Sequence, residues 1–176
     1  MCDITAVDAA AHYRQLLQLG REEFLASAAP AALVRHRSEM DEAPTSGVHT
    51  LSIDQEIEET LPHGRESPTA NFNLEVYPLT KKAGASFPDR ITIGRTANND
   101  IVIPDHSVSR LHAYVRRDGT QWVVADAGSK NGSWLSSVQL QPRKEKPLNS
   151  RADIRLGDVD LTFYNASDLF TALGGQ

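Results

Sequence analysis

The sequence has few of the features that mark secreted or membrane-spanning proteins. It contains one cysteine, Cys2, among 176 residues, so no disulfide can form within the chain and nothing indicates an oxidising compartment. No apolar run approaches the ~20 residues that cross a bilayer, and the first residues lack a basic stretch followed by an apolar one. These absences predict a soluble, cytoplasmic protein without a membrane partner.

An excess of positive charge is also absent. The formal net charge is −5 at pH 7, and a mildly acidic protein does not attract nucleic acid or anionic lipid over its whole surface. We therefore expect no nucleic-acid partner. Any anion that this protein binds has to be caught by a local group of donors.

The N-terminal part of the chain has a helical character. Residues Thr5 to Asp8 fit a capping box, the run from Ala9 to Leu17 is rich in good helix formers, and a second short helix is expected from Glu22 to Ala28, before Pro30. We predict a helical extension over residues 1–42. It either packs on a neighbouring domain or on itself, or it serves as a partner-binding helix.

The next stretch, residues 43–71, is polar, acidic and rich in turn formers. Few of its side chains are suited to burial, so it is predicted to be a linker.

From residue 72 onward the pattern changes to short β-type runs with turn signals between them, such as Asp118-Gly119. Many short strands at close spacing are typical of a β-sandwich or barrel, and residues 165–173 are expected to form a closing helix. The sequence therefore predicts one all-β domain over residues 72–176. The runs are Leu74–Leu79, Arg90–Ile93, Ile101–Ile103, Leu111–Val115, Gln121–Ala125 and Val159–Tyr164.

One segment, Asp105 to His112, allows several interpretations. Ser109 and His112 lie three residues apart, and an enzyme would use them as nucleophile and base. That chemistry also needs an orienting acid, an oxyanion hole and a cleft, none of which the sequence indicates. Alternatively, Ser109 caps backbone amides and His112 is packed, or the Ser109 hydroxyl donates to a bound anion. A metal site is not expected, because His106 and His112 have no cysteine companion.

Two further segments are weak signals when taken singly. Arg95 follows Gly94 at the end of a predicted strand, where the glycine is expected to permit an unusual backbone conformation and the arginine offers a fork of donors for phosphate or carboxylate. The segment Asp126 to Gly132 contains an Asn-Gly turn. It is not a Walker loop, since the spacing is wrong and no helix follows.

Their combination and order are more specific. Gly94-Arg95, Asn99-Asp100-Ile101, Ser109-Arg-Leu-His112 and Asp126-x-x-Ser129-x-Asn131-Gly132 follow one another, and this pattern resembles the signature of the forkhead-associated (FHA) family. The resemblance covers roughly residues 72 to 174. It implies an all-β, two-sheet FHA-type β-sandwich of about eleven strands, which here follows a short helical N-terminal region. It also implies binding of phosphothreonine peptides, without catalysis and without a cofactor.

Carried over by matching position, the resemblance assigns Arg95, Ser109 and Arg110 to the phosphate, and Asn131 to the peptide backbone. Lys130 falls where many members have a small hydroxylic residue that contacts phosphate, which makes this site more basic than many. Gly94, His112 and Gly132 are implied to shape the loops. One check does not depend on the resemblance: the loops at 104–110 and 127–132 are separated by two strands, so both are expected at the same end of a sheet.

The resulting hypothesis is a phosphothreonine-binding adaptor in Ser/Thr kinase signalling, whose partner is a phosphorylated protein and whose regulator is a kinase. Thr60, in an acidic segment, is a candidate regulatory phosphorylation site, because some bacterial members carry a threonine that folds back onto their own domain. The alternative is a phosphate-independent interaction module that uses the sandwich face or the N-terminal helices. That alternative predicts that deleting residues 1–42 abolishes partner binding.

Overall fold

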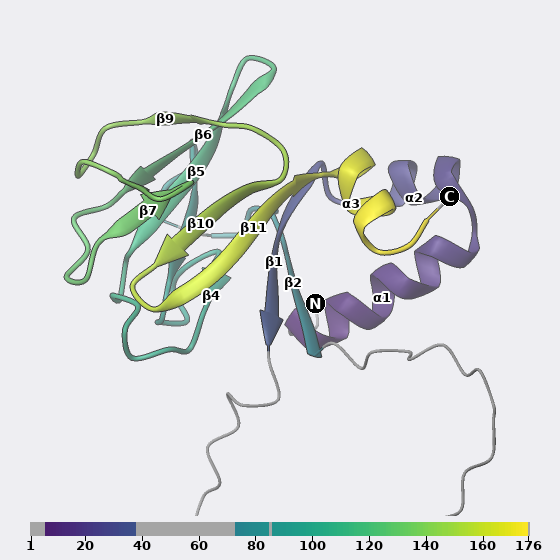
Figure 1. The fold of residues 1–176 in the computed structure, drawn as a ribbon, viewed down its shortest axis with the longest axis horizontal. Coiled ribbons are helices and arrows are strands. Elements are labelled where there is room, and N and C mark those ends of the chain that lie inside the picture. Colours follow the sequence, from purple (N-terminus) through teal and green to yellow (C-terminus); the bar gives the residue numbers. More distant parts are fainter. Residues whose placement is uncertain (1–5, 38–72, 85, 176) are drawn as a thin grey trace, which may run out of the picture.

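The computed structural model describes residues 6–37, 73–84 and 86–175. Within these ranges the chain forms three helices and eleven strands (Figure 1). In chain order they are α1 (Ala6–Gln18), α2 (Arg21–Ser27), β1 (Ala31–Arg37), β2 (Asn73–Pro78), β3 (Ile91–Gly94), β4 (Ile101–Val102), β5 (Ala113–Asp118), β6 (Gln121–Asp126), β7 (Ser133–Leu135), β8 (Val138–Gln139), β9 (Lys146–Leu148), β10 (Ala152–Leu156), β11 (Val159–Asn165) and α3 (Ala166–Ala172).

The strands form two sheets that pack face to face. One has the order β2-β1-β11-β10-β7-β8 and the other β4-β3-β5-β6-β9. Neighbouring strands are antiparallel except for β3 and β4. Their inner faces enclose a core of aliphatic side chains with Phe163 and Tyr77. The prediction of an all-β sandwich of about eleven strands is confirmed.

The helices form a third layer against one part of the sandwich. Figure 1 shows α1, α2 and α3 gathered beside β1, β2 and β11, away from the second sheet. Tyr13, Phe24 and Phe170 are buried there in a second core, with ring centroids of Phe24 and Phe170 5.2 Å apart. This layer buries the outer face of three strands that would otherwise meet water.

The helical prediction is wrong for one segment. Helices α1 and α2 confirm its first part, but Ala31–Arg37 is strand β1, which pairs with β11 on one side and β2 on the other. Ala31 and Leu33 face the core between the sheets, whereas Ala32 and Val34 face the helices. Because both faces are buried, the strand reads as a continuous apolar run without the alternation of a half-exposed strand.

The position of β1 also determines which elements residues 38–72 connect. Strands β1 and β2 are antiparallel, with Arg37 opposite Asn73, so the connecting segment leaves and re-enters the sandwich at neighbouring positions. Residues 38–72 therefore connect two paired strands of the same sheet. The predicted linker and Thr60 themselves lie outside the described residues, and the predicted domain boundaries stay predictions.

The chain ends with the expected short helix. The Asn165 side chain accepts a hydrogen bond of 2.8 Å from the Asp168 amide, which satisfies one of the free donors at the start of α3. Gly174 follows the helix with a φ of 96°, a left-handed conformation in which glycine commonly ends helices. No helix in the described ranges is both long enough and apolar enough to cross a membrane.

Candidate functional site

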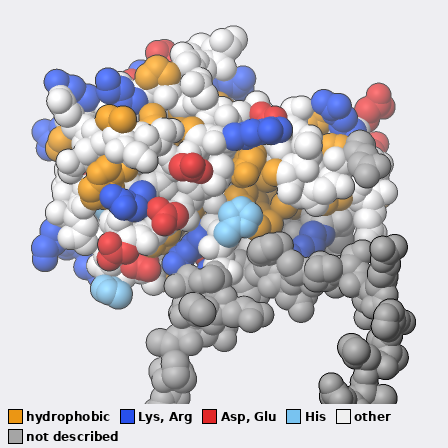
Figure 2. All heavy atoms as spheres, viewed as in Figure 1, with side chains coloured by type: hydrophobic (Ala, Val, Ile, Leu, Met, Phe, Trp, Pro, Cys, Tyr) orange, Lys and Arg blue, Asp and Glu red, His pale blue; other side chains and the backbone are white. Residues whose placement is uncertain are grey.

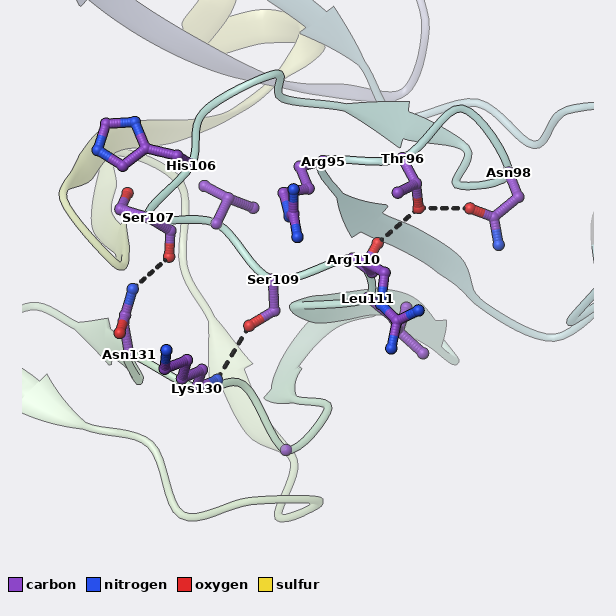
Figure 3. A pocket seen from close by; sticks show the side chains of 12 residues that line it. Arg95, Thr96, Asn98, His106, Ser107, Ser109, Arg110, Leu111, Lys130 and Asn131 are labelled. Carbon is purple, nitrogen blue, oxygen red and sulfur yellow. Dashed lines mark hydrogen bonds between the residues drawn. The ribbon is translucent and has the colours of Figure 1, made fainter.

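Three loops meet at one end of the sandwich and surround an open hollow of about 860 Å³. They are the β3–β4, β4–β5 and β6–β7 loops, and we call the hollow the three-loop site (Figure 3). Its lining residues are Arg95, Thr96, Asn98, His106, Ser107, Val108, Ser109, Arg110, Leu111, Gly128, Lys130 and Asn131.

The β3–β4 loop is fastened to the β4–β5 loop by backbone contacts. The Arg95 amide donates to the carbonyl oxygen of Ser109 at 3.1 Å, and the Asn99 side-chain amide donates to the carbonyl oxygen of Arg110 at 2.6 Å. These bonds hold Arg95 beside Ser109. Strand counting alone could not place Arg95 there; only the family resemblance implied that Arg95 and Ser109 lie together.

Gly94 permits this close approach through its size. A Cβ at this position would lie 2.2 Å from the Arg110 carbonyl oxygen and 2.7 Å from the Asn99 side-chain nitrogen. Its φ is not in the left-handed region, so the expectation of an unusual backbone conformation is wrong. Gly94 is required because no side chain fits between the two loops.

A buried carboxylate fixes the end of the β3–β4 loop. Asp100 accepts from Lys81 Nζ at 2.7 Å and from the Thr92 amide at 2.8 Å. Burial raises the pKa of Asp100, but these donors outweigh burial and the net pKa is lowered. Asp100 therefore stays ionised and holds the loop that carries Asn99.

Asp126 shapes the β6–β7 loop in the same way. Its carboxylate accepts from the backbone amides of Gly128 and Ser129 at 2.7 and 2.9 Å, and from the hydroxyl of Ser133. Burial opposes ionisation, yet the hydrogen bonds lower the pKa of Asp126. An ionised side chain that bonds the backbone two and three residues on produces the tight turn that precedes Lys130.

The β4–β5 and β6–β7 loops are joined directly. The Lys130 amide donates to Ser109 Oγ at 2.9 Å, and the Asn131 side chain donates to the Ser107 carbonyl oxygen at 2.7 Å (Figure 3). The expectation that both loops lie at the same end of the sheet is confirmed. The structure thus brings together Arg95, Ser109, Arg110, Lys130 and Asn131.

His112 supports this junction from inside. It is fully buried, its Nδ1 accepts from the Ser109 amide at 2.9 Å, and its Nε2 lies 2.9 Å from the Gly132 carbonyl oxygen. Since Nδ1 accepts, Nε2 carries the hydrogen and donates to Gly132. Burial lowers the pKa of His112, which keeps the ring neutral and consistent with both bonds.

The same bonds bear on the enzyme interpretation. A general base would need a free ring nitrogen directed at the Ser109 hydroxyl, but both nitrogens of His112 are engaged with backbone groups. Ser109 Oγ instead contacts the Lys130 amide. The pair is not arranged as nucleophile and base.

The cations of the three-loop site are available to a ligand. Arg95, Arg110 and Lys130 are exposed, and within the described ranges none of them forms an ion pair with a carboxylate. No lining residue is acidic. Elsewhere on the sandwich, in the view of Figure 2, basic and acidic side chains are interspersed. The site is therefore a local region of positive charge on an acidic protein.

Sequence reasoning missed two residues that brace the site. Ser107 is buried, donates its hydroxyl to Asp105 at 2.7 Å and accepts the Asp158 amide at 3.0 Å. Gly157 has a φ of 62°, and a Cβ there would lie 2.6 Å from the Ser107 carbonyl oxygen. The Gly157-Asp158 pair is a turn signal in the sequence, but its contact with Ser107 is visible only in the fold.

The chain is similar to known proteins over the segment that forms the three-loop site. The FHA domain model matches residues 91–157. An oxoglutarate dehydrogenase inhibitor of Corynebacterium jeikeium is 31% identical over 131 residues, which cover 70% of this chain and 89% of that protein. The protein of the same name from Corynebacterium diphtheriae is 36% identical over 100 residues, covering 55% and 68%. Among solved structures, Mycobacterium tuberculosis EmbR in complex with a low-affinity phosphopeptide is 34% identical, with a TM-score of 0.41, over 44% of this chain and 20% of that one.

Proposed function

The chain belongs to the FHA-domain family, and from this premise we propose that it binds a phosphothreonine segment of a partner protein in the three-loop site. The observation that carries the proposal is the meeting of Arg95, Ser109 and Lys130 from three different loops around one open hollow. These groups are donors, and no acidic side chain lines the hollow with them. Such a set suits a doubly charged ligand with several acceptor oxygens.

The hydrogen bonds within the site support a role for each of these residues. Ser109 Oγ already accepts from the Lys130 amide, and within the described part of the chain its own hydrogen has no acceptor, so it can donate to a phosphate oxygen. The exposed guanidinium of Arg95 offers a planar pair of donors to the other oxygens. The side-chain nitrogen of Asn131 is bonded to the Ser107 carbonyl oxygen, which fixes the side chain. Its side-chain oxygen has no donor in the described part of the chain and can accept a hydrogen bond from a peptide amide.

The expected affinity is moderate. A hydrogen bond to a charged group contributes about 1.5–3 kcal/mol, and a micromolar dissociation constant corresponds to about −8 kcal/mol. Two or three such bonds, with the peptide backbone contact, supply that range. The ligand is therefore recognised mainly by its phosphate.

The test is a direct comparison of phosphorylated and unphosphorylated peptides. Fluorescence anisotropy of a labelled threonine peptide should show binding only after phosphorylation. Arg95→Ala should weaken it about ten-fold or more, corresponding to one charge-assisted bond, without a change in melting temperature. Arg117→Ala, an exposed arginine of β5 outside the site, is the matched control. Unchanged binding by Arg95→Ala would refute the assignment.

A second proposal concerns the partner. The corynebacterial relatives are named oxoglutarate dehydrogenase inhibitors, and on that similarity we propose an oxoglutarate dehydrogenase as a partner and a Ser/Thr kinase as regulator. Purified protein added to the dehydrogenase assay should lower its rate. If the dehydrogenase rate does not change at a saturating concentration of the protein, the proposed partner is refuted, whereas the proposal of phosphopeptide binding still stands.

A further inference from the structure

The three-loop site carries more positive charge than one phosphate neutralises. A phosphothreonine brings about −1.5 to −2 charges near neutral pH, whereas Arg95, Arg110 and Lys130 bring three positive ones. Because none of the three has a carboxylate partner in the described ranges, a bound phosphate leaves positive charge unbalanced at the rim. That remainder is a recognition element for a second anionic group.

Within the described ranges, the three loops of the site do not supply this second group. Of the carboxylates in these loops, Asp100 is paired with Lys81, whereas Asp105 and Asp126 are bonded mainly within their own loops. Asp105 accepts from the amide and hydroxyl of Ser107 at 2.9 and 2.7 Å, and Asp126 accepts from the β6–β7 backbone. Neither lines the site.

The surplus cations lie on opposite sides of Ser109. In Figure 3 the Arg95 guanidinium lies beside Ser109, with Lys130 on one side and Arg110 on the other. The hydrogen bonds agree with this view. Lys130 is fixed through its amide to Ser109 Oγ on the side of the β6–β7 loop, whereas the Arg110 carbonyl is held by Asn99 and Thr96 on the side of the β3–β4 loop.

Both side chains are exposed, and both are long enough to reach past a phosphate toward its neighbours in a peptide. We propose that the phosphothreonine is flanked by acidic side chains, aspartate or glutamate; this inference rests on the proposed function. Lys130 contacts the acidic residues on one side of the phosphothreonine, and Arg110 contacts those on the other side. The two residues then determine specificity, while Arg95 and Ser109 provide the phosphate contact common to all ligands.

The experiment uses three phosphothreonine peptides of equal length and the full chain. One has alanine on both flanks, one has glutamate at the two preceding positions, and one has glutamate at the two following positions. An exposed charge pair contributes about 0.2–1 kcal/mol, so each acidic flank should tighten the dissociation constant by up to about five-fold. The gain should shrink as salt is raised, since charges at the rim are screened over about 8–10 Å.

The variants distinguish Lys130 from Arg110, and each is compared with its own affinity for the alanine-flanked phosphopeptide. Relative to that baseline, which either substitution is free to lower, Lys130→Met should abolish the gain from one acidic flank and Arg110→Met the gain from the other. Lys146→Met and Arg117→Met make the same chemical changes at exposed positions outside the site and should retain both gains.

Each outcome is decisive. Equal affinity of the wild-type protein for all three peptides would overturn this inference and leave the proposed function standing. The inference would also be overturned if Lys130→Met and Arg110→Met weakened all three peptides by the same factor and kept both gains, because the cations would then act on the phosphate alone. If the alanine-flanked phosphopeptide binds no better than its unphosphorylated form, the proposed function itself is refuted.

Discussion

The substitution Gly94→Ala tests how the three-loop site is assembled. The added methyl carbon would lie 2.2 Å from the Arg110 carbonyl oxygen and 2.7 Å from the Asn99 side chain. Backbone forms the nearer contact, so rotation of a side chain cannot relieve it. The β3 end and the β4–β5 loop have to separate, and the 2.6 Å bond from Asn99 to Arg110 is lost with that movement.

The expected loss of stability in Gly94→Ala has two contributions. Overpacking of a close contact costs about 1–3 kcal/mol, and the lost hydrogen bond adds about 1 kcal/mol. For a chain of this size, 1 kcal/mol corresponds to about 2–4 °C, so the melting temperature should fall by roughly 5–15 °C. Phosphopeptide affinity should fall at least about ten-fold, because Arg95 and Ser109 are positioned by the same contact.

The assays are thermal unfolding and peptide anisotropy on the same preparations. Gly119→Ala is the control, since Gly119 has a φ of 61° and open space around its Cβ position. Its cost is conformational, about 1 kcal/mol, and its affinity for the phosphopeptide should be unchanged. If Gly94→Ala matches the wild-type protein in both assays, the two loops do not approach each other as described.

Three other predictions concern separate parts of the chain. Asp126→Ala leaves the Ser129 amide and the Ser133 hydroxyl without their acceptor and should cost about 2–4 kcal/mol in urea unfolding, with weaker phosphopeptide binding; an unchanged midpoint would contradict its structural role. Burial lowers the pKa of His112 from 6.5, so below about pH 6.5 the unfolded chain takes up a proton that the folded protein does not, and the free energy of unfolding should drop between about pH 7 and pH 5.5; a constant value would argue against a neutral buried ring. Phosphorylation of Thr60 should lower affinity for an added phosphopeptide by competition within the chain, and Thr60→Ala should abolish that effect of kinase treatment.

The sequence is informative for most of the longer strands and misleading at β1, whose outer face is covered by the helices. The run over β1 was predicted as helix because nothing in residues 31–37 indicates a third layer. Val34 and Ala32 pack on side chains from α1, α2 and α3, and α3 lies more than a hundred residues further along the chain. Strands β7, β8 and β9 have only two or three residues, which is too short for a periodic signal.

The candidate site divides in a similar way. The approach of Ser109 to Lys130 follows from counting two strands and a tight turn between their loops, and the structure has the corresponding 2.9 Å bond. The approach of Arg95 to Ser109 does not follow from such counting. It depends on the pairing of β3 with β5, which brings the end of β3 beside the start of β5. Nothing in the sequence indicated that Ser107 braces the site, because its hydroxyl accepts from the Asp158 amide in a turn fifty residues away.

The N-terminal region bears on the alternative of a phosphate-independent interaction module. Deleting residues 1–42 would remove β1, whose Leu33 is fully buried in the main core and which separates β2 from β11. The deleted protein should fail to fold, so loss of a partner would say nothing about the helices. A truncated protein that unfolds at the wild-type temperature would show that β1 is dispensable.

A surface substitution avoids that ambiguity. Leu19 and Leu25 are 63% and 41% exposed and belong to the helical layer, away from the three-loop site. Changing both to glutamate removes exposed apolar surface at little cost in stability, about 0.5 kcal/mol each or less, and should leave phosphopeptide affinity unchanged. If this variant loses its partner while still binding the phosphopeptide, the helices are the docking surface. If it keeps the partner and Arg95→Ala loses it, recognition takes place at the loops.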